Sequence, residues 1–170
     1  RHAHRRQFHG LAPAMLQALL LTHEHGDHVS GARVLADQLG IPTYASRATG
    51  EELARTGRLG RIAIPFQPGA GFTVAGFEVL PFPVPHDALD PVGFRITMGT
   101  VTVGMATDIG HLSLLAQQRL RDCRLLVLES NHDVAMQLAS ERHLRHKRRV
   151  LGRHGHLSND EALAGLAQLL

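Results

Sequence analysis

Apolar residues lie in short runs separated by polar residues, glycines and prolines, and this pattern predicts strands that alternate with helices. The first apolar run enters a strand over 13–21. The segment 30–39 has helical spacing, with Gly40 as its expected stop. Further runs predict strands, the last of them buried, over 42–45, 72–74, 77–82, 92–98, 101–106 and 125–128. Gly76 and Gly99 are suited to the turns between neighbouring strands. The alternation is typical of a mixed α/β fold.

Two sequences of the capping-box type mark helix starts. Thr49-Gly50-Glu51-Glu52 predicts a short helix, and Ser158-Asn159-Asp160-Glu161 predicts a helix that runs through Leu170. Residues 112–120, and part of 134–150, are also predicted to be helical. Because the chain has 170 residues and neither an internal repeat nor a linker, we expect a single domain over 1–170.

Residues of metal-ligand type crowd together directly after the first predicted strand, at His23, His25, Asp27 and His28. His23 and His25 are two residues apart, so in extended chain their side chains point the same way. Asp27 and His28 are adjacent and project in different directions. One loop could therefore serve two metal ions, with imidazole for zinc or iron and a carboxylate for a harder or shared position. The alternative is a solvated polar loop.

The composition agrees with a cytoplasmic enzyme. Hydrophobic residues make up 44% of the chain but aromatic residues only 4%, so aliphatic side chains must fill the core. The single cysteine, Cys123, excludes an internal disulfide framework, and we expect it to be a small buried residue and not a nucleophile. No apolar run approaches the ~20 residues of a membrane span, and no signal-peptide core follows the basic start. The net charge of +3 permits an anionic substrate without requiring nucleic acid.

The run His23-Glu24-His25-Gly26-Asp27-His28 has the form HxHxDH, and through it the chain resembles the metallo-β-lactamase superfamily. Four later motifs resemble, in type and order, those of the WalJ/YycJ group of bacterial hydrolases: Pro85-His86-Asp87, Ala106-Thr107-Asp108, Leu128-Glu129-Ser130-Asn131-His132-Asp133 and Gly155-His156-Leu157-Ser158-Asn159. HxHxDH alone indicates only the superfamily, whereas the combination is more selective. The resemblance extends over nearly the whole chain from Gly10 onward.

The resemblance implies a metallo-β-lactamase αββα sandwich of two similar halves. Such folds begin with a β-hairpin before the HxHxDH strand and end with a strand that carries a last histidine ligand. This chain starts shortly before His23 and stops at Leu170. We therefore expect a sandwich truncated at both ends, with unpaired edge strands and exposed apolar surface.

The resemblance also implies a dinuclear metal site. His23, His25 and His86 would hold one divalent ion. The second ion would be held by Asp27 and His28, and Asp27 is also expected to take part in catalysis. Zinc is the expected metal for both positions, with manganese or iron as alternatives.

Asp108 would bridge the two ions in the implied site. From the residues alone, Asp108 could instead be the N-cap of the helix expected at Leu112. His86 could likewise be an ordinary polar residue of a proline-rich loop. Both alternatives are compatible with ligation.

Glu129 and His156 match a pair in the related ribonuclease Z group, where a glutamate orients a histidine that donates a proton to the leaving oxygen. The resemblance therefore implies that Glu129 is the orienting residue and His156 the general acid. His156 has two alternatives, because it could be the last metal ligand or a structural residue beside the helix start at Ser158. His132 and Asp133 could support the metal site or contact substrate.

The leading functional hypothesis is a metal-dependent hydrolase, specifically a phosphodiesterase acting on DNA, plausibly as a 5′-to-3′ exonuclease. Two alternatives stay open: a hydrolase of thioesters, lactones or cyclic phosphodiesters on the same fold, and a truncated metal-binding remnant without turnover. One basic stretch could contact phosphates or be a solvated helix face: Arg142, Arg145, Lys147, Arg148, Arg149 and Arg153. The remaining histidines are expected on the surface: His2, His4, His9, His111, His143, His146 and His154.

Overall fold

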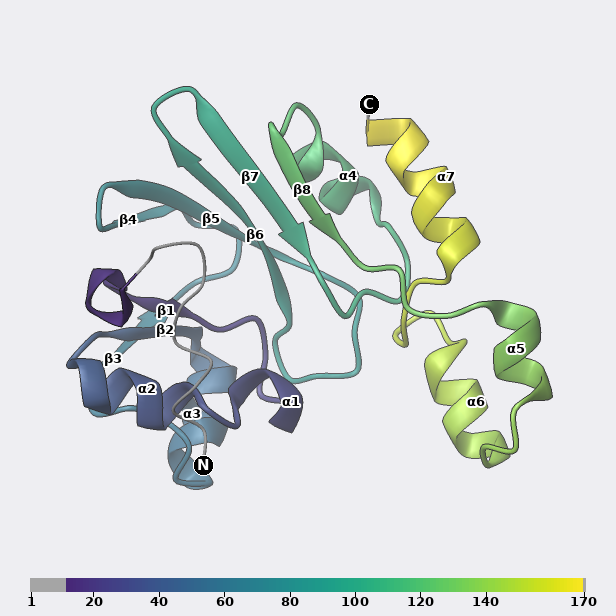
Figure 1. Ribbon diagram of the computed structural model, residues 1–170, viewed down its shortest axis with the longest axis horizontal. Coiled ribbons are helices and arrows are strands. Elements are labelled where there is room, and N and C mark those ends of the chain that lie inside the picture. The colour runs from purple at the N-terminus through teal and green to yellow at the C-terminus, as the bar shows by residue number, and fades with distance from the viewer. Residues whose placement is uncertain (1–11, 170) are drawn as a thin grey trace. The chain divides into compact units, whose positions relative to one another are not determined.

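The computed structural model describes residues 12–169 and divides the chain into two compact units, Arg1–Phe66 and Gln67–Leu170. The first unit contains a three-stranded sheet and the second a five-stranded sheet (Figure 1). The surface positions expected for His2, His4 and His9 lie outside the described residues. Among residues 12–169, no helix is long and apolar enough to cross a membrane.

The first unit is built on parallel strands joined by helices. A 3-10 helix, Pro13–Met15, precedes β1 (Leu19–Leu20), which pairs with β2 (Thr43–Ser46), and β2 pairs with β3 (Ala63–Phe66). Helices α1 (Gly26–Val29) and α2 (Ala32–Leu39) connect β1 to β2, and α3 (Arg47–Arg55) connects β2 to β3. A small core stabilises the unit, formed by Leu21, Val29, Ala45 and Leu53.

Several predictions for this unit were wrong in detail. The first strand is two residues long because Pro13 opens a 3-10 helix instead of a strand. The helix predicted over 30–39 begins earlier, at Gly26, and is split at residues 30–31. Ser46 caps α3, since its Oγ accepts a hydrogen bond from the backbone N–H of Thr49 at 3.4 Å. The stop at Gly40 is confirmed, because that residue has the left-handed φ of 64°.

The second unit has the strand order β4-β5-β6-β7-β8. The strands β4 (Phe72–Val74), β5 (Phe77–Pro83), β6 (Val92–Met98) and β7 (Val101–Ala106) are antiparallel neighbours, and β8 (Leu125–Leu128) joins β7 in parallel. The predicted turns are confirmed, with φ of 81° at Gly76 and 59° at Gly99. The sequence pattern thus predicted this sheet to within a residue at each strand end.

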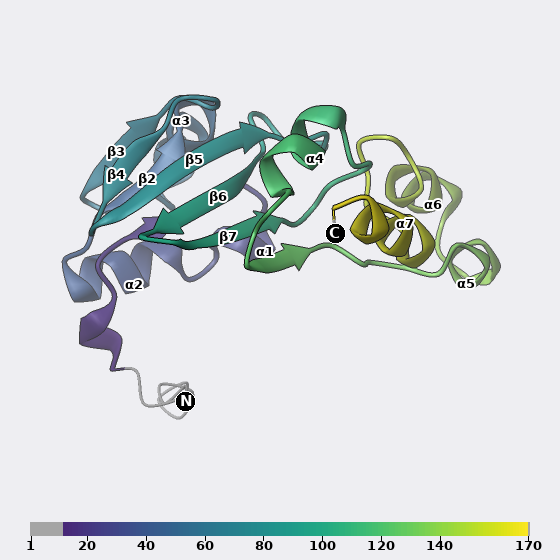
Figure 2. The same ribbon diagram turned by 90° about the horizontal axis from the view of Figure 1, so that it is seen from above.

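Helices α4 (Leu114–Leu120) and α7 (Asn159–Leu169) contact each other beside the five-stranded sheet (Figures 1 and 2). Their core includes Phe82, Ile109, Leu120 and Leu157, all at most 1% exposed. The capping box of α7 is confirmed, because Glu161 Oε2 accepts from both the N–H and the Oγ of Ser158. The segments that lead out of β7 and into α7 are therefore anchored to this core.

The prediction that the strand over 125–128 is buried was wrong. Leu125 and Val127 in β8 are 57% and 42% exposed, whereas Leu126 and Leu128 pack against the core. The cause is that only one face of β8 meets the helices, so alternate residues point away from them. Cys123, just before β8, is half-buried and not fully buried as expected. Desolvation raises the pKa of its thiol despite the nearby Arg95, which agrees with a residue that is not a nucleophile.

Two short helices, α5 (Val134–Ala139) and α6 (Leu144–Val150), lie side by side past the end of β8 (Figures 1 and 2). Lys147 Nζ donates a hydrogen bond from α6 to the carbonyl of Leu138 in α5. Val150 is the buried residue of α6, and most of its basic residues are exposed. The predicted basic stretch is therefore largely an exposed surface of this helix pair.

Candidate metal centre

The first group of predicted ligands lies on the segment that follows β1. The N–H of Leu21 donates to Tyr44 O at 2.9 Å, so the backbone is held to β2 up to the residue before Thr22. Thr22 Oγ1 then lies 3.0 Å from Nδ1 of His23 and 3.5 Å from Nδ1 of His28. Because Thr22 engages the Nδ1 side of both rings, Nε2 is the atom of each that is suited to ligation.

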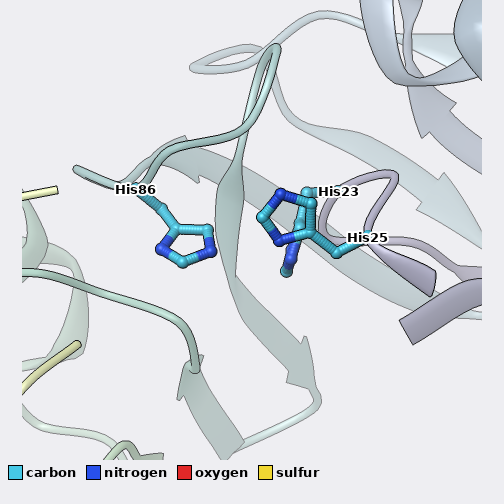
Figure 3. A group of neighbouring side chains, drawn as sticks. All are labelled: His23, His25 and His86. Carbon is cyan, nitrogen blue, oxygen red and sulfur yellow. The ribbon is translucent and has the colours of Figure 1, made fainter. Parts of the chain in front are cut away.

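The three histidines of this segment converge. The ring centroids of His23 and His25 are 4.6 Å apart with nearly perpendicular planes (Figure 3), and those of His23 and His28 are 4.2 Å apart. Asp27 and His28 belong to the single turn of α1, and Asp27 Oδ2 lies 3.6 Å from His28 Nε2. Thus the loop predicted from sequence is in part a helix start.

The pKa of Asp27 is lowered. Desolvation is the largest single influence and raises it, but the hydrogen bond from the Asp27 backbone and the nearby His28, His23 and His25 together outweigh that effect. The side chain is therefore a carboxylate at neutral pH, which is the form that binds cations.

The second group of predicted ligands consists of His86, Asp108 and His156, which come from the segments after β5 and β7 and before α7. His86 is labelled in Figure 3. Their ligand atoms all lie within 4.8 Å of one another. Asp108 Oδ1 is 4.0 Å from His86 Nε2 and 3.3 Å from His156 Nδ1. Asp108 has a φ of 54°, a left-handed conformation that aspartate tolerates better than most residues.

Asp108 does not cap the helix that follows it. Ser113 is the N-cap of α4, where its Oγ accepts from the N–H of Ala116 at 3.2 Å. The alternative interpretation of Asp108 as an N-cap was therefore wrong, and its carboxylate lies with His86 and His156 instead.

His86 is buried and its ring orientation is fixed. Its Nδ1 lies 3.0 Å from the carbonyl oxygen of Gly155, and because a carbonyl only accepts, Nδ1 carries the proton and the lone pair is on Nε2. The pKa of His86 is lowered, because the effect of burial is larger than the opposing effects of the Gly155 carbonyl and the Asp87 and Asp108 carboxylates. A neutral imidazole with its lone pair on Nε2 is the form that binds zinc.

Two glycines allow this close packing. A Cβ on Gly155 would lie 2.1 Å from Arg149 O, and one on Gly110 would lie 2.2 Å from Arg153 O. The N–H of Gly110 also donates to Pro85 O at 2.7 Å, next to His86. The sequence motifs contained Gly155, but nothing in their spacing indicated that its carbonyl oxygen accepts a hydrogen bond from His86 Nδ1.

Glu129 holds the loops of this second group together. Its Oε1 lies 2.8 Å from His156 Nδ1, and its Oε2 accepts from the N–H of Ile109 at 2.8 Å and of Leu157 at 3.1 Å. One carboxylate thereby fixes the backbone beside Asp108 and beside His156, as well as the His156 ring. This geometry is what an orienting residue requires.

Sequence reasoning missed the partner of Asp87. Arg149 in α6 makes a bidentate pair with it, through Nε to Oδ2 and through Nη2 to Oδ1 at 3.0 Å. Asp87 Oδ1 is in turn 3.3 Å from His86 Nε2. Arg149 is therefore paired with a carboxylate beside a predicted metal ligand, which the motif and charge pattern of the sequence did not indicate.

The remaining polar residues divide between structural and open roles. Asp133 caps α5 by accepting from Met136 N at 2.8 Å, and His143 accepts from Arg145 N at the start of α6. His146 and His154 are exposed, as predicted. His111 is only partly exposed, because its Nδ1 lies 3.0 Å from Arg153 O.

The donor set fits a divalent transition metal. Within each unit, imidazole nitrogens converge near a carboxylate, and His86 has the neutral form and the ring orientation that ligation needs. Borderline ions such as zinc accept both donor types, whereas calcium and magnesium prefer sets made only of oxygen.

The chain matches known proteins over nearly its full length. The family described as the beta-lactamase superfamily domain matches residues 1–169. Exodeoxyribonuclease WalJ of Streptococcus pneumoniae is 30% identical over 93% of this chain and 60% of its own length, and exodeoxyribonuclease YycJ of Bacillus anthracis is 31% identical over 91% and 60%. The metallo-beta-lactamase fold protein YhfI from Bacillus subtilis superposes with a TM-score of 0.61 at 27% identity, over 72% of this chain and 54% of its own. The chain thus spans about 60% of the length of the curated relatives it matches.

Proposed function

The chain belongs to the β-lactamase superfamily, and from this we propose that it carries the metal site and the general acid of a hydrolase that cleaves phosphodiester bonds in DNA. The observation that carries the proposal is the Glu129–His156 pair beside Asp108 and His86. The names of the WalJ and YycJ relatives indicate DNA as the substrate. A cytoplasmic location goes with that substrate and is part of the proposal.

We propose two divalent ions, with zinc preferred to manganese or iron. His23, His25 and His86 would hold one ion. Asp27 and His28 would hold the second, and Asp108 would contribute to both. Bound divalent ions would act as Lewis acids that activate water and offset the charge of the phosphodiester.

His156 is the proposed proton donor. Glu129 accepts a hydrogen bond from the Nδ1–H of His156, so the proton that is transferred to the leaving oxygen is the one on Nε2. In the reaction, water adds to phosphorus, the bond from phosphorus to the leaving oxygen breaks, and that oxygen takes the proton from His156. An alkoxide needs this help, whereas a thiolate leaves without it, and this difference favours a phosphodiester over a thioester.

Substrate class is tested by a side-by-side assay with the complete, metal-loaded gene product. Labelled DNA, bis(p-nitrophenyl) phosphate, a glutathione thioester and a lactone are compared under the same conditions. We expect cleavage of DNA and of the small phosphodiester. Turnover of the thioester or lactone, with neither phosphodiester cleaved, would replace the nuclease proposal with that of a small-molecule hydrolase. Absence of any turnover would indicate a metal-binding remnant.

The residue roles are tested by separating metal content from turnover. His156→Ala should reduce DNA cleavage by roughly 10²–10⁴-fold while metal content stays the same. His23→Ala should lose metal, because one of three imidazole ligands is removed. Loss of metal from His156→Ala would instead make His156 a ligand, and full metal content in His23→Ala would remove His23 from the site.

A further inference from the structure

A pocket of about 630 Å³ lies in the second unit beside His156. Its size is in the range of small-molecule sites, which is ~300–1,000 Å³. Its charged and hydrogen-bonding lining residues are His111, His132, Arg153, His156, Ser158, Asp160 and Glu161. Because His156 is the proposed proton donor, whatever accepts its proton lies at the edge of this pocket.

His132 is held firmly at this pocket by its backbone. The N–H of Asn131 donates to Leu157 O and the N–H of Asn159 donates to His132 O, both at 2.9 Å, and His132 pairs with Ser158 in a parallel bridge. The segment that bears His132 therefore runs alongside the segment that bears His156. Asp133, the next residue, is occupied as the cap of α5 and has no comparable position.

The His132 ring has one nitrogen to offer. Its Nδ1 is buried and has no hydrogen-bond partner among residues 12–169. A buried lone pair is less costly than a buried unpaired N–H, so the favoured tautomer carries its proton on Nε2. His132, which lines the pocket on a fixed backbone, therefore has an N–H donor at Nε2.

The pocket combines opposite charges. Arg153 supplies a cation, and Asp160 and Glu161 supply carboxylates. Hydrogen bonds from Ser158 keep the Glu161 carboxylate in place and lower its pKa. Asp160 and Glu161 would repel an isolated phosphate ion, and a wholly apolar ligand would leave the polar groups of the pocket without hydrogen-bond partners. A nucleotide offers phosphate and sugar oxygens as acceptors, and base or hydroxyl hydrogens as donors, so it matches both signs.

We propose that this pocket binds the nucleotide on the leaving side of the cleaved phosphodiester, and that His132 donates a hydrogen bond to it. The proposal rests on the proposed function. The leaving oxygen that takes the His156 proton becomes a hydroxyl of the bound nucleotide, while the attacking water gives its extra proton to solvent. His132 is thus a substrate-contact residue, and its side chain takes no part in proton transfer.

The test compares His132→Ala and His132→Gln with His146→Ala, an exposed histidine of α6 outside the pocket. Each variant of the complete gene product is assayed on a dinucleotide and on bis(p-nitrophenyl) phosphate, and is titrated with thymidine monophosphate by calorimetry. For His132→Ala we expect about tenfold weaker nucleotide binding and a similar rise in dinucleotide KM, as fits the loss of one hydrogen bond. Metal content should not change, and His132→Gln should recover part of the affinity.

Equal nucleotide binding by His132→Ala and His146→Ala would overturn the proposal, and so would a loss of metal in His132→Ala. The calorimetric titration requires no catalysis. Nucleotide binding that depends on His132 in a protein that cleaves no phosphodiester would therefore contradict the proposed function while upholding the pocket.

Discussion

The pair between Arg149 and Asp87 leads to a prediction that separates two neighbouring arginines of α6. Arg149 makes two hydrogen bonds to Asp87, which itself lies 3.3 Å from Nε2 of His86. Arg148 has no carboxylate partner among the described residues and is exposed. Replacing each arginine by glutamine should therefore have different effects on stability, although the two residues are adjacent and have the same charge.

The expected loss of stability in Arg149→Gln follows from the exposure and geometry of its pair with Asp87. The side chains of Arg149 and Asp87 are 46% and 34% exposed, so solvent screens much of their attraction. Bidentate geometry places the pair at the upper end of what exposed pairs contribute, about 1 kcal/mol. Arg149→Gln should thus lower the melting temperature by about 2–4 °C in a domain of this size. For Arg148→Gln the expected change in stability is within about 0.5 kcal/mol of zero.

The coupling energy between Asp87 and Arg149 comes from thermal melts of the complete gene product and its variants. The variants are Arg149→Gln, Asp87→Asn and the double variant Asp87→Asn/Arg149→Gln. We expect a coupling of about 1 kcal/mol that shrinks in high salt. Equal melting temperatures for the two arginine variants, together with zero coupling to Asp87, would refute the argument. In that case Arg149 would be as available to DNA as Arg148.

Three further changes test other parts of the structure. Because hydrogen bonds from Ser158 lower the pKa of Glu161 from its ordinary 4.5, its contribution is complete above that value and is lost as pH falls through the lowered pKa. Melts of Glu161→Gln should therefore show a loss of about 1 kcal/mol at neutral pH that disappears in acid. Gly110→Ala should destabilise the protein by roughly 2 kcal/mol or more because of the 2.2 Å approach to Arg153 O, whereas Gly31→Ala, with open space around it, should be nearly neutral in the same denaturation assay. If Arg148 contacts a phosphate, Arg148→Gln should reduce the salt dependence of DNA binding by about one ion, and an unchanged slope would make α6 a solvated face.

The second unit could be predicted from sequence more accurately than the first. Its strands are long enough to show alternation, and Gly76 and Gly99 mark its turns with positive φ. In the first unit, β1 has two residues and β3 contains Pro65, so neither carries a clear periodic signal. Exposure of Leu125 was also unpredictable, since a short apolar run does not reveal which of its faces the rest of the fold covers.

In the candidate site, the residues with possible chemical roles could be predicted from the sequence, but the contacts that hold them in place could not. The resemblance of the motifs to a known family implied roles for Asp108, Glu129 and His156 in metal binding or proton transfer. It could not show that one Glu129 oxygen accepts from the backbone on both sides of the site, or that Gly155 fixes the His86 tautomer. Those contacts join segments far apart in sequence through backbone atoms, which every residue possesses and no residue type reveals. Loss of the Glu129 carboxylate would therefore disturb two loops as well as the His156 ring, and turnover lost in a Glu129 variant would measure positioning together with any effect on the proton.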